Sequence, residues 1–330
     1  AGAMSLRNRM YDTGIKRARG LGRPTISIGN LTAGGTGKTP MIRWLAANLR
    51  DAGRTVAVLS RGYKSAAGTL GDEQRMLECC LNSPGTRPVI IRANPSRLIA
   101  AEAALKENAS IDVFLLDDGF QHRAAARDLD IVLLSATDPF GLEHVLPRGL
   151  LREPVRGLAR AGAVVITHAD RAGEAQLGQI EARVRRHNPT APIYRAIHAP
   201  TGLRTAQAAS SGTPDLALDD LRARRFFAFC GLGNPDVLHR QLESFGRSYA
   251  GHRWFPDHHH YTAQDLAYLR AQATSTGAQL LVTTEKDWVK VAELAGAQNG
   301  QPAIWRIDVE IQFLGDGGPR LIGQVRSLLK

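Results

Sequence analysis

The stretch GNLTAGGTGKTP, residues 29–40, decides how the first part of this chain folds. It follows an apolar run, TISI at residues 25–28, and it precedes apolar residues at helical spacing, namely Ile42, Leu45, Ala46 and Leu49. A strand, a glycine-rich bend and a helix in this order are typical of a phosphate-binding loop, in which backbone amides and the positive end of the helix surround a phosphate. The alternative is a glycine-rich turn with a surface lysine.

The loop departs from the strict G-x-x-x-x-G-K-[ST] pattern, because Thr32 stands where the first glycine belongs. The Lys38 ammonium can reach the β and γ phosphates of ATP, and the Thr39 hydroxyl can bind Mg²⁺. The residues that we expect to surround the nucleotide phosphates are Gly34, Gly35, Thr36, Gly37, Lys38 and Thr39.

A second signal is VFLLDDGFQH, residues 113–122, in which an apolar run ends in Asp117 and Asp118. Carboxylates at the carboxyl end of a strand beside a phosphate loop can hold Mg²⁺ directly or through water. The alternative is an aspartate pair that caps a helix.

Short β-rich runs alternate with helical patterns, which predicts an α/β fold: a P-loop NTPase-like, mostly parallel sheet flanked by helices. Residues 201–220 are rich in Ala, Ser, Thr, Gly and Pro, and we interpret them as a connection to a second, smaller α/β domain. The predicted domains are therefore 1–200, with a basic N-terminal segment, and 201–330, which closes over the nucleotide and the acceptor. The expected strands are 25–28, 55–59, 89–92, 113–116, 131–134 and 164–167, then 226–229, 279–282 and 304–309.

The 330 residues include 42 Lys and Arg against 31 Asp and Glu, a net charge of +11. Such an excess favours nucleic acid, phosphorylated substrates or an anionic membrane surface. No aromatic and basic motif supports nucleic acid, so we expect no nucleic-acid partner. Cys79, Cys80 and Cys230 fit neither a disulfide framework nor a zinc site. No apolar run approaches the roughly 20 residues that span a bilayer.

Five further motifs carry little weight alone: SRGY at 60–63, GDE at 71–73, LREP at 151–154, FPDHHHY at 255–261 and TTEKD at 283–287. In this order, together with the loop, DDGFQHRAAARDLDIVLL and GLGNP, they resemble the tetraacyldisaccharide 4′-kinase family of lipid A biosynthesis over residues 23–290. The phosphate loop of that family also lacks the first glycine. The resemblance implies ATP-dependent phosphorylation of the 4′-hydroxyl of a lipid A disaccharide-1-phosphate precursor, giving lipid IVA.

The resemblance also implies site roles. Lys38 and Arg152 act on the transferring phosphate, and Mg²⁺ is held by Thr39, Asp117, Asp118, Glu73 and Glu153. The nucleotide is further contacted, near its adenine, by Thr284, Glu285, Lys286 and Asp287. The acceptor is contacted by Asn30, Tyr63, Gln121 and His122.

Asp72 and His258 would form the dyad that activates the sugar hydroxyl. A hydroxyl is a poor nucleophile and gains from a base within hydrogen-bond reach, although the sequence does not say which member takes the proton. Without the resemblance, Asp72 is better interpreted as a helix cap and His258 as a surface histidine.

Members of this family usually begin with a longer apolar segment that anchors them at the inner membrane. Here MSLRNRMYDTGIKRARGLGRP, residues 4–24, precedes the first strand, with basic side chains at Arg7, Arg9, Lys16, Arg17, Arg19 and Arg23. Such a segment can lie on an anionic surface but cannot span a bilayer. We expect peripheral attachment to the cytoplasmic face of the bacterial inner membrane, weaker than the family norm.

Two other functions fit the loop and the acidic strand. One is another phosphate-loop kinase or ligase, similar to dethiobiotin synthetase, which has no need for DDGFQH and DHHHY together. The other is a MinD-like, nucleotide-switched binding ATPase, which would hydrolyse ATP slowly and use no lipid acceptor.

Overall fold

The computed structural model describes residues 2–62, 71–82, 85–205, 215–233, 235–257, 259–292, 294 and 300–329, without the side chains of 2–6, 72, 73 and 237. The chain divides into two compact units. Unit 1 comprises Ala1–Leu81, Arg87–His198 and Ile311–Lys330, and unit 2 comprises Asn82–Thr86 and Ala199–Glu310. The first boundary lies close to the expected residue 200, but the C-terminal residues expected in the second domain belong to unit 1.

Unit 1 is built on a sheet in the order β3-β2-β4-β1-β5-β6-β7, in which the neighbouring strands are parallel. The predicted mostly parallel sheet is therefore confirmed. Its strands are β1 (Thr25–Asn30), β2 (Val56–Ser60), β3 (Ile90–Ala93), β4 (Val113–Asp117), β5 (Leu129–Ser135), β6 (Ala163–Thr167) and β7 (Ile193–Arg204), of which β7 continues into unit 2.

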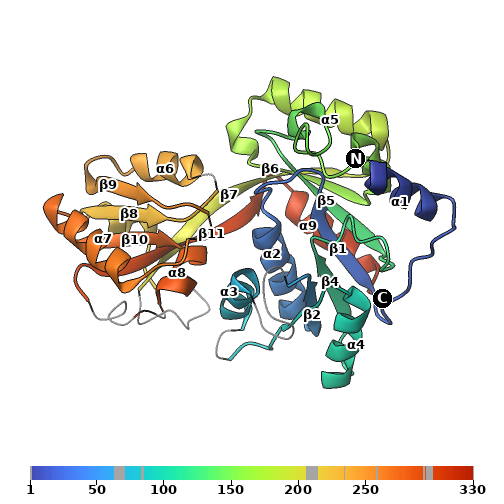
Figure 1. The fold of residues 1–330 in the computed structure, drawn as a ribbon, viewed down its shortest axis with the longest axis horizontal. Coiled ribbons are helices and arrows are strands. Elements are labelled where there is room, and N and C mark those ends of the chain that lie inside the picture. Colours follow the sequence, from blue (N-terminus) through green and yellow to red (C-terminus); the bar gives the residue numbers. More distant parts are fainter. Residues whose placement is uncertain are drawn as a thin grey trace. The chain divides into compact units, whose positions relative to one another are not determined.

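Helices cover both faces of this sheet, as Figure 1 shows. One face packs against α2 (Lys38–Asp51), α3 (Asp72–Leu81) and α9 (Gly317–Ser327). The other face packs against α4 (Arg97–Glu107) and α5 (Glu174–His187). Strands buried on both faces are continuously apolar rather than alternating, which is why the sequence predicted them as uninterrupted apolar runs.

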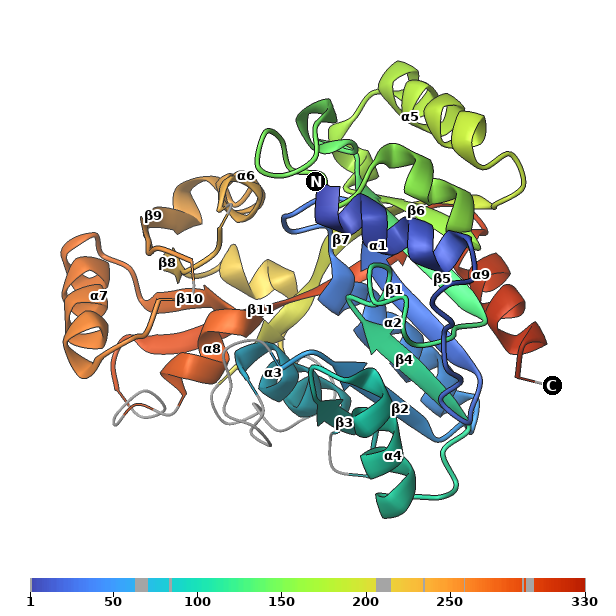
Figure 2. The same ribbon diagram turned by 45° about the vertical axis from the view of Figure 1, so that its right-hand side comes forward.

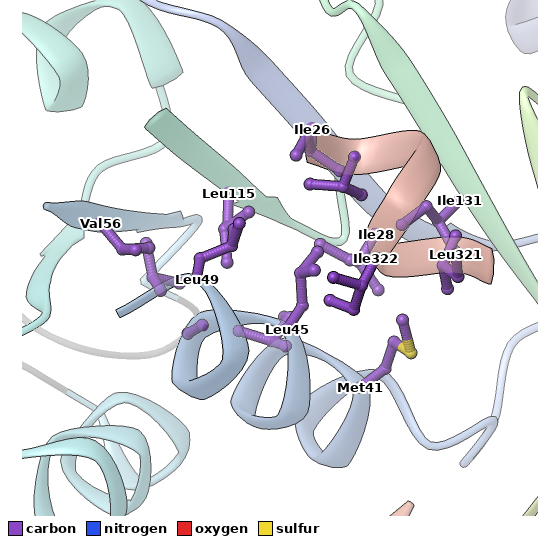
Figure 3. Packing of buried hydrophobic residues seen from close by; sticks show 14 of the residues in the cluster. Ile26, Ile28, Met41, Leu45, Leu49, Val56, Leu115, Ile131, Leu321 and Ile322 are labelled. Carbon is purple, nitrogen blue, oxygen red and sulfur yellow. The ribbon is translucent and has the colours of Figure 1, made fainter. Parts of the chain in front are cut away.

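The helix after the phosphate loop, α2, packs on the sheet through the same periodic apolar residues that predicted it. Its buried side chains recur at helical spacing and pack on β1, β4 and α9 (Figure 3). The labelled residues of this packing are Ile26, Ile28, Met41, Leu45, Leu49, Val56, Leu115, Ile131, Leu321 and Ile322. Burial of one such side chain stabilises the fold by roughly 1.5–3 kcal/mol. The core therefore fixes the start of α2 relative to the end of β1.

The loops after β1 and β4 pack against each other. Ile28 of β1 lies beside Asp117 of β4 in the parallel register, so both strands end at the same edge of the sheet. A Cβ added to Gly29 would lie 2.6 Å from the Cβ of Phe120. Only glycine permits this approach, which brings the acidic loop next to the phosphate loop.

Unit 2 is a smaller α/β layer structure with the strand order β11-β10-β8-β9, parallel from β11 through β9. Its helices α7 and α8 pack on one face, and α6 packs on the other. The elements are β8 (Phe226–Cys230), α6 (Asp236–Glu243), β9 (Tyr249–Trp254), α7 (Ala263–Ser275), β10 (Leu280–Thr284), α8 (Glu285–Val291) and β11 (Ala303–Phe313), which continues into unit 1.

The predicted connection at residues 201–220 is only partly irregular. β7 extends to Arg204, and a short 3₁₀ turn occupies Leu218–Leu221. Residues 206–214 lie outside the described part of the chain.

The N-terminal segment forms a helix, α1 (Gly2–Asp12), seen in dark blue in Figure 2. Within the described residues, no helix combines the length and the apolar character needed to cross a bilayer.

Candidate active site

The phosphate loop predicted from the sequence joins β1 to α2. Gly37, the N-cap of α2, has φ 83°, in the left-handed region, and carries no side chain that could cap the first turn of that helix. Gly34 also has a positive φ of 140°, so both glycines adopt backbone angles that other residues rarely take. The amide groups at the start of α2 therefore point their partial positive charge at a position where an anion can bind.

Thr32 fits the loop because the backbone there needs no glycine. It is not among the residues with a positive φ, and it forms an antiparallel bridge with Leu151. Next to this bridge, the Arg152 backbone N–H donates to the Leu31 carbonyl at 2.7 Å. The pairing holds the segment that carries Arg152 against the phosphate loop.

Three charged side chains converge beside the loop. Asp118 has Oδ2 at 2.5 Å from Arg152 Nη1 and Oδ1 at 3.6 Å from Lys38 Nζ. Burial opposes ionisation of this carboxyl, but the charges of Lys38 and Arg152 outweigh burial and hold the pKa of Asp118 below its usual value. The site therefore presents one carboxylate between two cations.

The same carboxylate offers a position for Mg²⁺. Asp118 Oδ1 is buried and accepts no hydrogen bond from the described residues, so it keeps lone pairs for a cation. The neighbouring Asp117 ends β4 and is buried. The described residues contain no group of three or more His, Cys, Asp or Glu that could hold a metal ion. Because Mg²⁺ usually takes one or two carboxylates together with substrate phosphates and water, this donor set fits it.

The half-buried Gln121 and the buried Glu153 form a hydrogen-bond network at the end of β1. Gln121 Nε2 donates to the Asn30 carbonyl at 2.8 Å and to Glu153 Oε1 at 3.1 Å. Arg160 Nη2 donates to both Glu153 oxygens at 2.9 Å, and Asn8 Nδ2 donates to Oε2 at 3.2 Å. Each oxygen of Glu153 thus accepts two hydrogen bonds that fix the network, and its role as a Mg²⁺ ligand stays a prediction.

Two of the residues predicted to contact the acceptor are His122, which is half-buried, and Asn30, which is buried. Burial, followed by the charge of Arg97, lowers the pKa of His122 to about 4, so its imidazole is neutral at pH 7. Asn30 is fully buried, and its Nδ2 donates to the Thr32 carbonyl at 2.8 Å. The acceptor roles of Asn30, Gln121 and His122 stay predictions.

Four predicted site residues lie where no side chain is described. Tyr63 and His258 are outside the described residues. Asp72 and Glu73 open α3, so a helix does begin at GDE, but their side chains are not described. The dyad of Asp72 and His258 therefore stays a prediction.

The TTEKD residues lie in unit 2 and make contacts there. The Thr284 hydroxyl accepts from the Asp287 backbone N–H at 3.2 Å and donates to Asp287 Oδ2 at 2.7 Å, which caps α8. Lys286 pairs with Asp257 at 2.7 Å, and Glu285 accepts from a buried arginine of β11 at 3.2 Å. Their contact with the adenine stays a prediction.

A pair of histidines next to the loop, of which His198 is buried and His168 half-buried, was not expected from the sequence. His198 Nδ1 lies 2.8 Å from His168 Nε2, and His168 Nδ1 lies 3.2 Å from Ser135 Oγ. A Cβ added to Gly37 would lie 2.3 Å from His198 Nε2, so this imidazole packs on the loop backbone. Burial is the largest cause that lowers the pKa of His168 to about 4 and of His198 to about 3. For His168, the available signal in the sequence was its position directly after the apolar run at residues 164–167.

Comparisons with known proteins identify relatives of this chain. Residues 1–329 match the family model described as tetraacyldisaccharide-1-P 4′-kinase. A tetraacyldisaccharide 4′-kinase of Anaeromyxobacter dehalogenans (strain 2CP-C) is 42% identical over 326 residues, which cover 94% of this chain and 83% of that protein. Its counterpart in Syntrophus aciditrophicus (strain SB) is 40% identical over 311 residues, covering 88% of this chain and 81% of that protein.

A solved structure extends the similarity to the fold. The crystal structure of LpxK from Aquifex aeolicus, described as an "apo" form in complex with ATP, superposes with a TM-score of 0.73 at 27% identity. The match covers 100% of this chain and 96% of that chain. On its sequence and its fold, this chain belongs to the tetraacyldisaccharide-1-P 4′-kinase family.

Proposed function

We propose that this chain transfers the γ-phosphate of ATP to the 4′-hydroxyl of a tetraacyldisaccharide 1-phosphate, the lipid A precursor, giving lipid IVA. Membership of the family supports the reaction. The observation that carries it in this chain is the convergence of Lys38, Asp118 and Arg152 on the uncapped start of α2. Binding of ATP is supported by the Aquifex aeolicus relative, whose crystal structure is described as an ATP complex.

In the proposed reaction, the described residues bind and orient the phosphates and neutralise their charge. The phosphate passes directly to the acceptor, without a covalent intermediate on the protein. The amides at the start of α2 and the Lys38 ammonium bind the β and γ phosphates, and Arg152 stabilises the charge that spreads over the transferring group. The 4′-oxygen forms a bond to the γ-phosphorus while the bond from that phosphorus to the β–γ bridging oxygen breaks, and ADP leaves. Asp118 and Thr39 would hold Mg²⁺, which would supply further charge neutralisation.

The hydroxyl proton must leave as the new bond forms. We assign it to the dyad of Asp72 and His258, because a base within hydrogen-bond reach raises the nucleophilicity of an alcohol. The neutral His122 and the other predicted acceptor contacts would then orient the sugar.

We also propose that the chain works at the anionic, cytoplasmic surface of the inner membrane, where a lipid acceptor resides. The segment after α1 supports this proposal, because Ile15 is 72% exposed and the nearby basic residues Lys16, Arg17 and Arg19 are exposed as well. Arg9, in the last turn of α1, is also exposed. Positive charge together with an apolar side chain favours an anionic lipid surface.

The direct test incubates the purified protein with γ-labelled ATP, Mg²⁺ and the disaccharide-1-phosphate lipid. We expect label in a lipid product. In Lys38→Ala we expect its rate to fall by at least about 10²-fold with unchanged thermal unfolding, since a phosphate loop loses its main cation. Lys106→Ala, which removes an exposed lysine of α4, should behave like the unaltered protein. Release of labelled phosphate without labelled lipid would instead favour a nucleotide-switched ATPase.

A further inference from the structure

The helix α1 is hydrogen-bonded to the loop that follows β4. Arg7 Nη2 donates to the Gln121 carbonyl at 2.7 Å. In return, Arg123 Nη1 donates to the Asn8 carbonyl at 2.8 Å and pairs with Asp12 at 2.7 Å. The helix thus donates to an acceptor on the loop, and the loop donates to acceptors on the helix. Arg7 faces the protein rather than solvent.

Asn8 of the same helix reaches a buried carboxylate. Its Nδ2 donates to Glu153 Oε2 at 3.2 Å, and Glu153 is 1% exposed. The other donors that the described residues give to this carboxylate are Arg160 and Gln121. A buried carboxylate is costly to leave short of hydrogen bonds. The Asn8 amide thus helps to hold the Glu153 carboxylate in place.

Glu153 in turn fixes groups beside the phosphate loop. It adjoins Arg152, whose guanidinium pairs with Asp118 at 2.5 Å. It also orients Gln121, which donates to the Asn30 carbonyl at 2.8 Å, at the end of β1. A shift of the Glu153 carboxylate would therefore move the Arg152 guanidinium and the phosphate loop, both of which face the transferring phosphate in the proposed reaction.

We propose that Asn8 and Arg7 are positioning residues of the kinase site, so that α1 sets the geometry of Gln121, Glu153 and Arg152. The proposal rests on the proposed phosphoryl transfer and gives α1 a role separate from lipid contact. Misplacement of a reacting group by about 1 Å can cost about 10²-fold in rate. The effect of losing this support should thus appear in turnover rather than in nucleotide affinity.

The test compares Asn8→Ala and Asn8→Asp with a control, Thr13→Ala, in the full chain. The exposed Thr13 hydroxyl donates only to carbonyls of α1 among its described contacts. We expect Asn8→Ala to lower kcat about tenfold, as for a lost hydrogen bond to a charged group, with the KM for ATP changed less than about twofold. Asn8→Asp keeps the volume but places a second carboxylate beside Glu153, so kcat should fall further. Thr13→Ala should leave both constants unchanged.

A double-mutant cycle separates positioning from general destabilisation of the helix. Because Asn8 acts through Glu153, Asn8→Ala combined with Glu153→Gln should be no slower than Glu153→Gln alone. Unchanged turnover in both Asn8 variants, or losses that multiply in the double variant, would overturn the proposal. Label transfer by the unaltered protein is measured first. If that protein transfers no label, the proposed function fails and this proposal falls with it.

Discussion

Among the described residues, Lys38 has two oxygen partners, Asn30 Oδ1 at 3.3 Å and Asp118 Oδ1 at 3.6 Å. Both distances exceed the 2.7–3.2 Å or so that is usual for a strong N–H···O hydrogen bond, so a phosphate oxygen can compete for the ammonium. The sequence predicted Lys38 because its motif is local. It did not predict Asn30 as its partner, because that contact depends on the path of the loop between them.

The histidine pair predicts how acid affects stability. The pKa of His168 is lowered to about 4 and that of His198 to about 3, from an ordinary 6.5. The unfolded chain therefore binds protons that the folded chain excludes. The stabilising contribution is complete above about pH 6.5 and is lost as the pH falls toward the folded pKa, at up to about 1.4 kcal/mol per pH unit for each histidine.

Urea unfolding at several values between pH 7 and about 4 measures this effect. His168→Gln should show a shallower fall of the free energy of unfolding than the unaltered protein. His144→Gln, which changes an exposed histidine, should keep the steep fall. Equal slopes in all three proteins would mean that the histidine pair does not govern the acid response.

At the scale of elements, the segment that follows α1 separates membrane contact from positioning. Lys16, Arg17 and Arg19 are exposed, whereas Arg7 and Asn8 are engaged with the site. Replacing the three exposed cations by Gln should weaken sedimentation with anionic vesicles, most strongly at low salt, because such attraction is screened over about 8 Å at physiological ionic strength.

The matched control for this experiment removes three exposed cations elsewhere. Lys106, Arg186 and Arg326 are all exposed, so their replacement by Gln changes the net charge equally. Turnover with a detergent-dispersed acceptor should be normal in both triple variants. If both sediment alike, overall charge rather than the N-terminal segment directs the chain to the surface.

Several of the strands that the sequence predicted are uniformly buried. β1, β4 and β5 are buried along their whole lengths, and an apolar run reveals such strands directly. β7 was not predicted because its first part alternates between buried and half-buried positions, and Arg195 and His198 interrupt its apolar residues. α9 begins with Gly-Gly-Pro, which local propensity disfavours. Proline is tolerated in a first turn, and Leu321 and Val325 then face the core.

The same reasoning explains which contacts within the site were missed. Lys38 and Asp118 stand in recognisable local motifs, so the sequence was enough to find them. Asn8 and Glu153, by contrast, are 145 residues apart in the sequence, and neither residue type predicts the contact. Arg160 follows Glu153 by seven positions, yet an arginine in a polar run has many possible partners. Contacts of this kind require the fold to be known.

At the scale of the whole molecule, the proposed dyad assigns one residue to each unit. Asp72 belongs to unit 1, and His258 lies in the range of unit 2. If the two act together, loss of either residue removes the base that takes the proton from the 4′-hydroxyl. Replacing either residue by Ala should lower turnover by about 10²–10⁴-fold, the usual range for general acid–base catalysis, with little change in the dissociation constant of ATP.

Single-turnover label transfer by both single variants and the double variant tests this prediction. Partners that act as a unit are non-additive, so the double variant should be scarcely slower than the slower single one. His260→Ala is the control, because that histidine is exposed. His259 stacks on Phe255 with ring centroids 4.5 Å apart and pairs with Asp265 at 3.2 Å, so we expect His259→Ala to affect the stability of unit 2 more than the chemical step. A greater loss of turnover at His259 than at His258, or fully multiplicative losses in the double variant, would place the base on a different histidine or give it a different partner.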